Sequence, residues 1–460
     1  MTQASFTKLA LSQDLPNNLS TLGYQTMTPI QEQSLPLILA NKDVIAQGKT
    51  GSGKTAAFAL GLLEKLEVKR FCVQALILCP TRELADQVAK EVRKLARAIH
   101  NIKVLTLCGG IPFGPQVGSL EHGAHIIVGT PGRVADHLRR GTLNINNVNT
   151  LVLDEADRML DMGFQPTLDA IVKLTPIKRQ TLLFSATFPD QIKSICKRIM
   201  VKPIMVQAIS AHADSVIGQH FYKVENDQQR LTALRLLLLQ HHPESAVVFC
   251  NTKIEVKRIA ESLGNDGFNV LALHGDLEQR DRDQTLLLFD NKSVSVLVAT
   301  DVAARGLDID AVDLVINYHV AHDTEVYIHR IGRTGRAGTQ GLACSLFSEK
   351  EEYRVSLLGE YLHRFIESET LPPMSVLDVP PNQPLMTTLQ IDGGKKQKVR
   401  PGDILGALTG KNGIAGKQVG KIHIFANHAY VAVEKNTAKA ALKKLTEGKL
   451  KGRSFRVRLI

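Results

Sequence analysis

The fold of this chain is set by one short stretch, Gly48-Lys49-Thr50-Gly51-Ser52-Gly53-Lys54-Thr55. It lies between an apolar run at residues 43–46 and a helical pattern that begins at Ala56. In the pattern G-x-x-x-x-G-K-[ST], backbone N–H groups wrap a phosphate and the helix N-terminus attracts its charge. Lys54 can then reach the outer phosphates, and Thr55 can ligate Mg²⁺. The stretch predicts a nucleotide phosphate site; a glycine-rich turn without a ligand is the alternative.

Outward from this loop, the first 370 residues alternate short apolar runs with longer helical patterns. The apolar runs are continuous, which is typical of parallel strands that helices bury on both faces. We expect strands at residues 43–46, 75–79, 104–107, 125–128, 151–153 and 181–184, then at 246–250, 270–273, 295–299 and 314–317. The pattern predicts two doubly wound α/β domains with parallel sheets, residues 1–207 and 217–370, separated by a weak break at 208–218.

An acidic run, Asp154-Glu155-Ala156-Asp157, directly follows the expected strand at 151–153. Because open α/β sheets bind ligands at the carboxyl ends of their strands, this run should lie near the phosphate loop. Asp154 can then hold Mg²⁺, directly or through water, and Glu155 can act as general base toward the attacking water. Taken alone, the same run could be the charged first turn of a helix.

Further motifs make the chain resemble a DEAD-box RNA helicase in their order and spacing. They are Pro80-Thr81-Arg82-Glu83-Leu84-Ala85, Gly109-Gly110, Thr130-Pro131-Gly132-Arg133, Ser185-Ala186-Thr187, Ala299-Thr300-Asp301 through Arg305-Gly306-Leu307-Asp308, and His329-Arg330-Ile331-Gly332-Arg333-Thr334-Gly335-Arg336. The resemblance implies that both α/β domains are RecA-like, and that the protein is an RNA-stimulated ATPase using ATP and Mg²⁺.

The resemblance also assigns residues to the ATP site. It implies that Gln31 binds adenine, Phe6 covers the base, Asp301 contacts the ribose, and Arg333 and Arg336 neutralise the transferring phosphoryl group. Outside such a motif, two arginines three apart would indicate a solvated helix. The expected ATP-binding residues are Phe6, Gln31, Gly48, Lys49, Thr50, Gly51, Ser52, Gly53, Lys54, Thr55 and Asp301. The expected catalytic residues are Lys54, Asp154, Glu155, Arg333 and Arg336, and the expected metal ligands are Thr55 and Asp154.

RNA contacts and coupling residues follow from the same resemblance. The expected contacts of the two domains are to phosphate and 2′-OH groups, which carry no sequence information. They are Arg82, Gly110, Thr130, Arg133, Thr252, Gln279, Arg282, Thr300 and Arg305. The residues expected to couple the ATP state to domain closure are Asp157, Ser185, Thr187 and His329; Ser-Ala-Thr by itself is a common turn.

Charge is distributed very unevenly in this chain of 460 residues with a formal net charge of +11. From residue 384 to 460 there are 16 Lys and Arg against 4 Asp and Glu, so the other 383 residues are nearly neutral. A basic terminal module favours attachment to nucleic acid, although a solvated basic face would have the same composition. The proline-rich residues 371–384, just before this module, predict a linker. Six scattered cysteines and the lack of an apolar span or leader favour a cytoplasmic protein without zinc or membrane attachment.

The basic tail, residues 385–460, reads as strand, helix, strand, strand, helix, strand, an RRM-like α+β order. It also resembles the bacterial DbpA type of the family. Strand alternation predicts an open face with Lys421, His423, Phe425, His428, Tyr430, Arg456 and Arg458. Tyr430 is the expected stacking contact, but Gln390 and His428 stand where aromatic residues are usual. We therefore also expect RNA contacts in the loop with Lys395, Lys396, Lys398 and Arg400; His428 could equally be a structural surface histidine.

The sequence thus predicts an ATP-dependent RNA helicase that opens short duplexes. The DbpA-type resemblance implies structured RNA of the large ribosomal subunit as its target, and no obligate protein partner is evident. Two alternatives stay open. One is an RNA clamp or annealing protein whose ATPase times release, and the other is a DNA translocase on the same motor fold.

Overall fold

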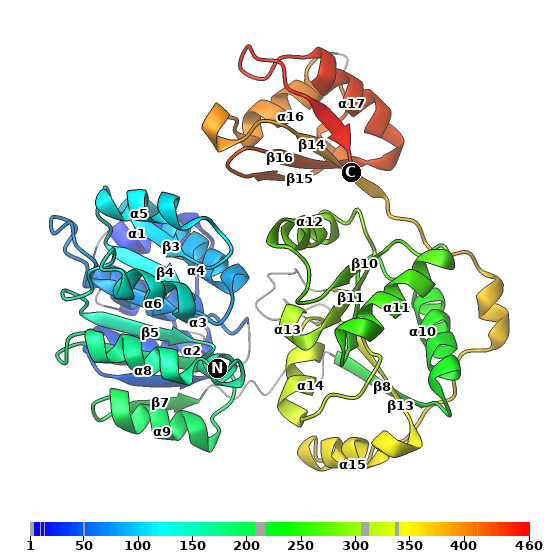
Figure 1. Ribbon diagram of the computed structural model, residues 1–460, viewed down its shortest axis with the longest axis horizontal. Helices are drawn as coiled ribbons and strands as arrows, with labels where there is room; N and C mark the ends of the chain where they lie inside the picture. The colour runs from blue at the N-terminus through cyan, green and yellow to red at the C-terminus, as the bar shows by residue number, and fades with distance from the viewer. Residues whose placement is uncertain are drawn as a thin grey trace. The chain divides into compact units, whose positions relative to one another are not determined.

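A computed structural model of the protein describes residues 4–9, 11–12, 14–48, 51–207, 217–304, 312–335, 340–411 and 413–460. These residues form two compact units, one from the part of the chain up to residue 207 and one from residue 217 onward (Figure 1). The second unit holds two separate sheets. Among the described helices, none is long and apolar enough to cross a membrane.

The described strands of the first unit form a seven-stranded sheet in which every neighbouring pair is parallel. Their spatial order is β3 (Val104–Leu107), β4 (Ile126–Gly129), β2 (Ala75–Leu78), β5 (Thr150–Asp154), β6 (Gln180–Ser185), β1 (Val44–Gln47) and β7 (Ile204–Gln207). Because all strands run the same way, the phosphate loop after β1 and the acidic run after β5 emerge at one edge of the sheet.

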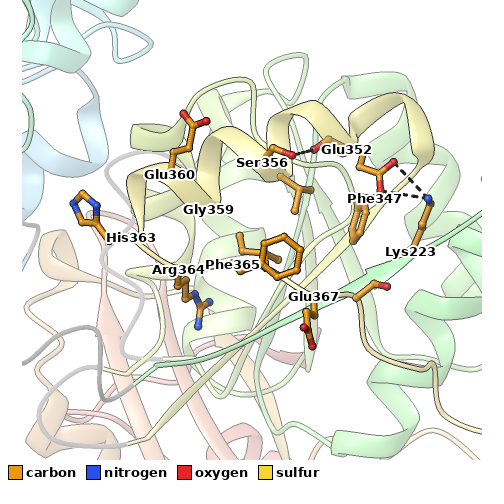
Figure 2. A pocket seen from close by; sticks show the side chains of 13 residues that line it. Lys223, Phe347, Glu352, Ser356, Gly359, Glu360, His363, Arg364, Phe365 and Glu367 are labelled. Carbon is orange, nitrogen blue, oxygen red and sulfur yellow. Dashed lines mark hydrogen bonds and ion pairs between the residues drawn. The ribbon is translucent and has the colours of Figure 1, made fainter.

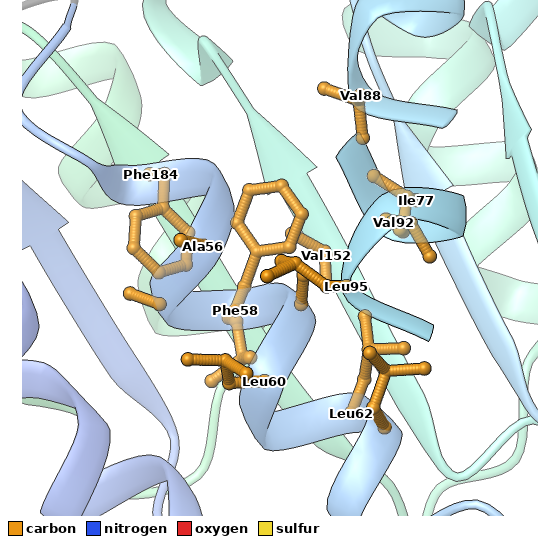
Figure 3. Close-up of a cluster of buried hydrophobic side chains, with 14 of the residues drawn as sticks. Ala56, Phe58, Leu60, Leu62, Ile77, Val88, Val92, Leu95, Val152 and Phe184 are labelled. Carbon is orange, nitrogen blue, oxygen red and sulfur yellow. The ribbon is translucent and has the colours of Figure 1, made fainter. Parts of the chain in front are cut away.

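Helices bury both faces of this sheet, as continuous apolar strands require. One face packs against α1 (Asp14–Thr21), α2 (Pro29–Leu39), α3 (Lys54–Glu64) and α4 (Arg82–Leu95). The other packs against α6 (Pro131–Arg139), α7 (Ala156–Asp161), α8 (Gln165–Leu174) and α9 (Asp190–Ile199); α5 (Phe113–Glu121) follows β3. Figure 3 shows the first core, where Phe58 lies between Phe184, Val152 and the α4 residues Val88 and Val92.

The second unit begins with another parallel sheet, six-stranded within its described residues. The order is β10 (Val270–Leu273), β11 (Val296–Thr300), β9 (Ala246–Cys250), β12 (Leu314–Asn317), β13 (Gly341–Phe347) and β8 (Ile217–Lys223). Its helices are α10 (Asp227–His241), α11 (Lys253–Asn265), α12 (Gln279–Asp290), α13 (Asp301–Ala304), α14 (Thr324–Ile331) and α15 (Glu352–Tyr361).

The C-terminal part is an antiparallel α+β fold, as the sequence predicts. The sheet order is β15 (Val419–Ile424), β16 (Ala429–Glu434), β14 (Met386–Ile391) and β17 (Val457–Leu459), and the helices are α16 (Pro401–Thr409) and α17 (Ala438–Glu447). Leu389, Ile391, Val431 and Val433 are buried against these helices. Leu459, in contrast, stays 43% exposed, because β17 is a short edge strand.

The ten strands predicted for the two α/β domains are confirmed, each within about a residue of its expected bounds. The sequence reading missed β7, β8 and β13. β7 and β8 lie at the sheet edges and mix polar with apolar residues, so their runs are too short to stand out. β8 also occupies residues 217–218 of the predicted break, whose other residues, 208–216, lie outside the described part. In the predicted linker, the only described element is a 3-10 turn, Met374–Asp378.

Candidate nucleotide and RNA-binding site

The phosphate loop connects β1 to α3, and its residues 48 and 51–55 are described, whereas Lys49 and Thr50 lie outside the described residues. Gly53 caps α3 with a φ of +90°, a left-handed conformation that favours glycine, and an added Cβ would overlap the Gln31 side chain. The buried Lys54 ammonium donates to the Gly48 carbonyl at 2.6 Å, which keeps it inside the loop. The Lys54 ammonium is therefore held by the loop backbone, close to the N-terminus of α3.

Residues at the start of α2 form hydrogen bonds to this loop. The Gln31 side-chain oxygen accepts from the Thr28 N–H at 2.9 Å, and its amide nitrogen donates to the Gly53 carbonyl at 3.0 Å. The Thr28 hydroxyl donates to the Ser52 carbonyl at 2.7 Å. An amide has two donors and two acceptor sites, so Gln31 keeps capacity for the predicted adenine contact. Phe6 is buried in the first core and edge-on to Tyr24, with 3% of it exposed.

Asp154 and Glu155 stand at the end of β5, at the same sheet edge as the loop. Both are buried. Glu155 has a φ of +50°, a left-handed conformation that is unusual for a side-chain-bearing residue and turns the chain sharply from β5 into α7. Burial raises the pKa of Asp154 to about 7, although the nearby Lys54 partly opposes the shift. The acidic run is thus a strand-end turn, and its residues 156–161 form α7.

Two observations fit a phosphate with its Mg²⁺ at this place. The Ser52 hydroxyl is buried and has no hydrogen-bond partner among the described residues, as expected of a group that awaits a ligand. Within the described part of the chain, the buried Asp154 carboxyl forms no ion pair, and a divalent cation would supply the positive charge. Thr55, on the first turn of α3, provides the hydroxyl that the pattern assigns to the metal.

Three predicted coupling residues meet in the first unit. One Asp157 carboxylate oxygen accepts from the Thr187 N–H at 3.0 Å and from the Thr187 hydroxyl at 2.9 Å. The same oxygen accepts from the Ala186 N–H at 3.2 Å, while the Asp157 N–H donates to the Ser185 hydroxyl at 3.4 Å. The loop after β6 is therefore tied to the acidic run by one carboxylate.

The predicted RNA contacts of the first unit follow three adjacent strands, β2, β4 and β3. Arg82 begins α4, Gly110 follows β3, and Thr130 and Arg133 follow β4. Gly110 has a φ of +65°, and an added Cβ would lie 1.9 Å from the Arg82 guanidinium, so these two residues are in contact. One guanidinium nitrogen of Arg82 is buried without a hydrogen-bond partner in the described structure. We define this group of four residues as the RNA edge.

In the second unit, Asp301 is held by a residue to which the sequence reading gave no role. Both Asp301 carboxylate oxygens accept from Arg330, at 2.7 and 2.8 Å. The buried Arg330 also donates to the His319 carbonyl at 2.7 Å and to the Asn317 and Asn251 side chains at 3.2 Å. Arg330 stands in the quoted motif His329 to Arg336, so that motif carried the signal.

Other predicted residues of the second unit lie at strand or helix ends. Thr252, after β9, caps α11 and donates to Glu255 at 3.0 Å. Thr300 ends β11, Gln279 begins α12, and Arg282 on α12 donates to the Ala303 carbonyl at 2.6 Å. Arg333 is buried just after α14, which carries His329. Arg305 and Arg336 lie outside the described residues.

The predicted basic loop of the C-terminal fold connects β14 to α16. Lys395, Lys396, Lys398 and Arg400 are all exposed. The backbone N–H groups of Lys395 and Lys396 donate to the carbonyls of residues 425 and 426, at 2.8 and 3.0 Å, which anchors the loop to the turn between β15 and β16. The structure adds Lys451, whose ammonium donates to the Lys398 carbonyl at 2.9 Å and lies 3.3 Å from Asp403. Because Lys451 is far from this loop in the sequence, the sequence alone does not reveal this fifth cation.

The sheet face of the C-terminal fold meets the end of α12. Asp290 pairs with Lys421 at 2.7 Å and with His423 at 3.1 Å, and Asn291 donates to the Thr388 hydroxyl at 3.0 Å. Burial raises the pKa of Asp290, but the hydrogen bonds from His423 and Lys421 outweigh it and lower the pKa overall. Thr388 and Gln390 on this face are buried, whereas Tyr430 keeps partial exposure beside Phe425. The face predicted to be open is therefore partly covered.

An open hollow of about 1190 Å³ lies under α15 in the second unit, and Figure 2 shows its lining. Glu352 and Glu360 of α15 line it, together with Lys223 and the chain from His363 to Ser368. Of the described residues predicted to bind ATP or RNA, none lines it. Its walls combine charged side chains with the apolar Phe347, Val355 and Ile366 and the exposed Phe365. Because it shares no described residue with the site above, the hollow is separate from that site.

Comparisons with known proteins agree with this geometry. Residues 28–195 match the DEAD/DEAH box helicase family, residues 229–338 the helicase conserved C-terminal domain, and residues 388–459 the DbpA RNA binding domain. The chain is 53% identical to the ATP-dependent RNA helicase DbpA of Escherichia coli K12 over 96% of both chains. It is 45% identical to the DEAD-box ATP-dependent RNA helicase CshA of Geobacillus kaustophilus, over 75% of this chain and 74% of that one. Saccharomyces cerevisiae Dbp5 bound to RNA and ADP BeF3 is similar in structure, with a TM-score of 0.72 and 32% identity over 81% of this chain and 97% of that one.

Proposed function

Because this chain belongs to the DEAD-box family of ATP-dependent RNA helicases, we propose that it locally opens short RNA duplexes in structured RNA of the large ribosomal subunit during ribosome assembly. The likeness to the DbpA type extends through the C-terminal RNA-binding domain and supports this target. Such a target would place the protein in the cytoplasm, where it would act without an obligate protein partner.

ATP hydrolysis would use the strand-end carboxylates. The loop N–H groups and Lys54 would bind the phosphates, and Thr55 and Asp154 would hold Mg²⁺. When bound, the metal neutralises charge on the phosphates. Glu155, fixed by the turn after β5, would take the proton of the attacking water. Arg333 and Arg336 of the second unit would stabilise the charge that develops on the transferring phosphoryl group.

RNA would be gripped by its backbone. The observation that carries this step is the RNA edge, where Gly110, Arg133 and the Arg82 nitrogen that has no partner among the described residues gather at the ends of three neighbouring strands. Thr252, Thr300, Gln279, Arg282 and Arg305 would add contacts from the second unit. ATP binding would bring the two units together around one strand, and bending that strand would displace its partner; hydrolysis would reverse the closure.

The C-terminal fold would select the RNA. Its exposed basic loop, with Lys451 beside it, supports binding through this loop, because α12 covers part of the sheet face. Tyr430, which keeps partial exposure on that face, stays a predicted stacking contact. The neighbouring Lys421 and His423 are already engaged by Asp290, so they contribute little to RNA.

Strand displacement tests the proposal. A short labelled RNA duplex beside a large-subunit ribosomal RNA fragment should separate when ATP is added. With the duplex in excess over protein, the Glu155→Gln variant should separate about one duplex per protein and then stop, because only reopening needs hydrolysis. ATP turnover without displacement would favour the clamp or annealing alternative. Equal stimulation of the ATPase by single-stranded DNA would favour the DNA translocase, because only RNA presents the 2′-OH.

A further inference from the structure

An aromatic ring beside the RNA edge holds two guanidinium groups. Phe113 begins α5, three residues after Gly110. The guanidinium carbon of Arg133 lies 5.6 Å from the centre of its ring, and that of Arg140 lies 4.5 Å from it. Arg133 also donates to the Ile111 carbonyl at 2.9 Å. The loop after β3 and helix α6 are therefore joined through Phe113 and Arg133.

The ring itself is fixed by a buried histidine. His137 of α6 stacks on Phe113 with ring centres 4.1 Å apart and an angle of 15° between the rings. The two His137 ring nitrogens pair with the Gln116 side-chain oxygen at 3.0 Å and with the Thr142 hydroxyl at 2.8 Å. Burial, and then the charge of Arg133, lower the pKa of His137, so this ring is neutral near pH 7. Phe113 thus has little freedom to rotate.

Arg139 is the last residue of α6 and Arg140 directly follows it, but the two side chains have different surroundings. Arg139 forms an ion pair with Asp136. Arg140 is exposed, and within the described residues its guanidinium forms no hydrogen bond or ion pair. Contact with an aromatic face leaves the N–H groups at the guanidinium edge free to bind an anion. Arg140 is therefore an oriented cation with an unused hydrogen-bonding edge, next to a residue expected to bind RNA.

We propose that Arg140 is a further contact to an RNA backbone phosphate, and that Phe113 is the residue that positions it. This inference rests on the proposed function, because it extends the RNA edge beyond Arg133. A phosphate is the ligand that fits, since the guanidinium fork pairs with it in a bidentate manner and no base-specific group lies beside it. The ring lowers the entropy that an exposed arginine would lose on binding.

The test uses the full chain, a non-hydrolysable ATP analogue and a fluorescent oligouridylate, which is a generic single strand. Anisotropy titrations at several KCl concentrations give the Kd and its salt dependence. Arg140→Gln should weaken binding about three- to tenfold and reduce the slope of log Kd against log salt by about 0.7, as expected when one phosphate contact is lost. Arg139→Gln removes the same charge one residue away and is the matched control, expected to stay within about twofold of the parent.

Phe113→Leu should reproduce the loss seen in Arg140→Gln, whereas Phe113→Tyr should keep the parent affinity because the ring remains. Adding Phe113→Leu to Arg140→Gln should weaken binding little further, because the Arg140 interaction is already lost and Arg133 keeps its hydrogen bond to the Ile111 carbonyl. Equal effects of Arg140→Gln and Arg139→Gln would overturn the proposal, and both variants alter exposed residues that the fold does not need. Arg133→Gln separates failure of this proposal from failure of the proposed function. If Arg133→Gln also leaves RNA binding unchanged, the RNA edge itself is wrong.

Discussion

Asp154 should make the binding of Mg²⁺ and nucleotide depend on pH. Burial raises its pKa from an ordinary value of 3.8 to about 7, so about half of the free protein carries a proton there at pH 7. Only the ionised carboxylate can hold a cation. The raised pKa therefore predicts that the proton leaves when the metal binds, and that affinity falls as pH drops through 7.

The size of the effect follows from that pKa. The bound complex should release about 0.9 protons at pH 6, about 0.5 at pH 7 and about 0.1 at pH 8, when Asp154 is compared with a residue that cannot ionise. The same titration predicts an affinity about tenfold higher at pH 8 than at pH 6. The nucleotide phosphates also release protons when they bind. The relevant quantity is therefore the difference in proton release between the parent and Asp154→Asn, which retains the shape of the side chain.

Calorimetry in pairs of buffers with different ionisation heats measures the released protons directly. The titrant is a non-hydrolysable ATP analogue with excess Mg²⁺, and Glu155→Gln serves as a control that should keep the release. Identical proton release in the parent and in Asp154→Asn would refute the reasoning. That result would mean either that Asp154 is already ionised in the free protein or that it does not hold the metal.

The remaining predictions concern turnover and RNA grip. Glu155→Gln should keep ATP and RNA binding but lose about 10²-fold or more in kcat, because an amide cannot accept the proton of water. Single-turnover hydrolysis measures this, and turnover like that of the parent would show that Glu155 is not the general base. Gly110→Ala should weaken RNA binding without changing ATP affinity, because its Cβ would overlap Arg82 and the φ of +65° costs about 1 kcal/mol for alanine. An unchanged Kd in RNA titrations would contradict the Arg82 contact. Arg336→Ala should reduce kcat more than ATP affinity, and a loss confined to nucleotide binding would argue against a role in charge stabilisation.

The elements nearest the phosphate site were the most predictable from the sequence. The loop, the strand before it and the helix after it form one local unit, and the apolar runs at residues 75–79 and 246–250 left little choice but buried parallel strands. The edge strands β7 and β8 are not predicted, because apolar residues do not run continuously along them. Ile204 and Met205 of β7, for example, are 38% and 41% exposed, so no continuous apolar run marks that strand.

Long-range contacts set the limit for the site. The sequence placed Asp301 but could not show that Arg330 takes both of its oxygens, since the two residues are 29 positions apart. Strand alternation correctly sorted the faces of the C-terminal sheet. It could not reveal that Asp290, on a helix of the preceding domain, covers part of the face expected to be open. Such pairings depend on how separate elements pack.

The central claim is that the basic C-terminal module selects the RNA while the two parallel-sheet domains act on any backbone. RNA-stimulated ATPase activity of the full chain and of a chain ending at residue 383 tests it, with a large-subunit ribosomal RNA fragment and an unrelated structured RNA of equal length. The full chain should reach half-maximal stimulation at a much lower concentration of the ribosomal fragment than of the unrelated RNA. The truncated chain should need high concentrations of both and prefer neither. Equally sharp discrimination by the truncated chain would contradict the account, because selection would then lie in the α/β domains.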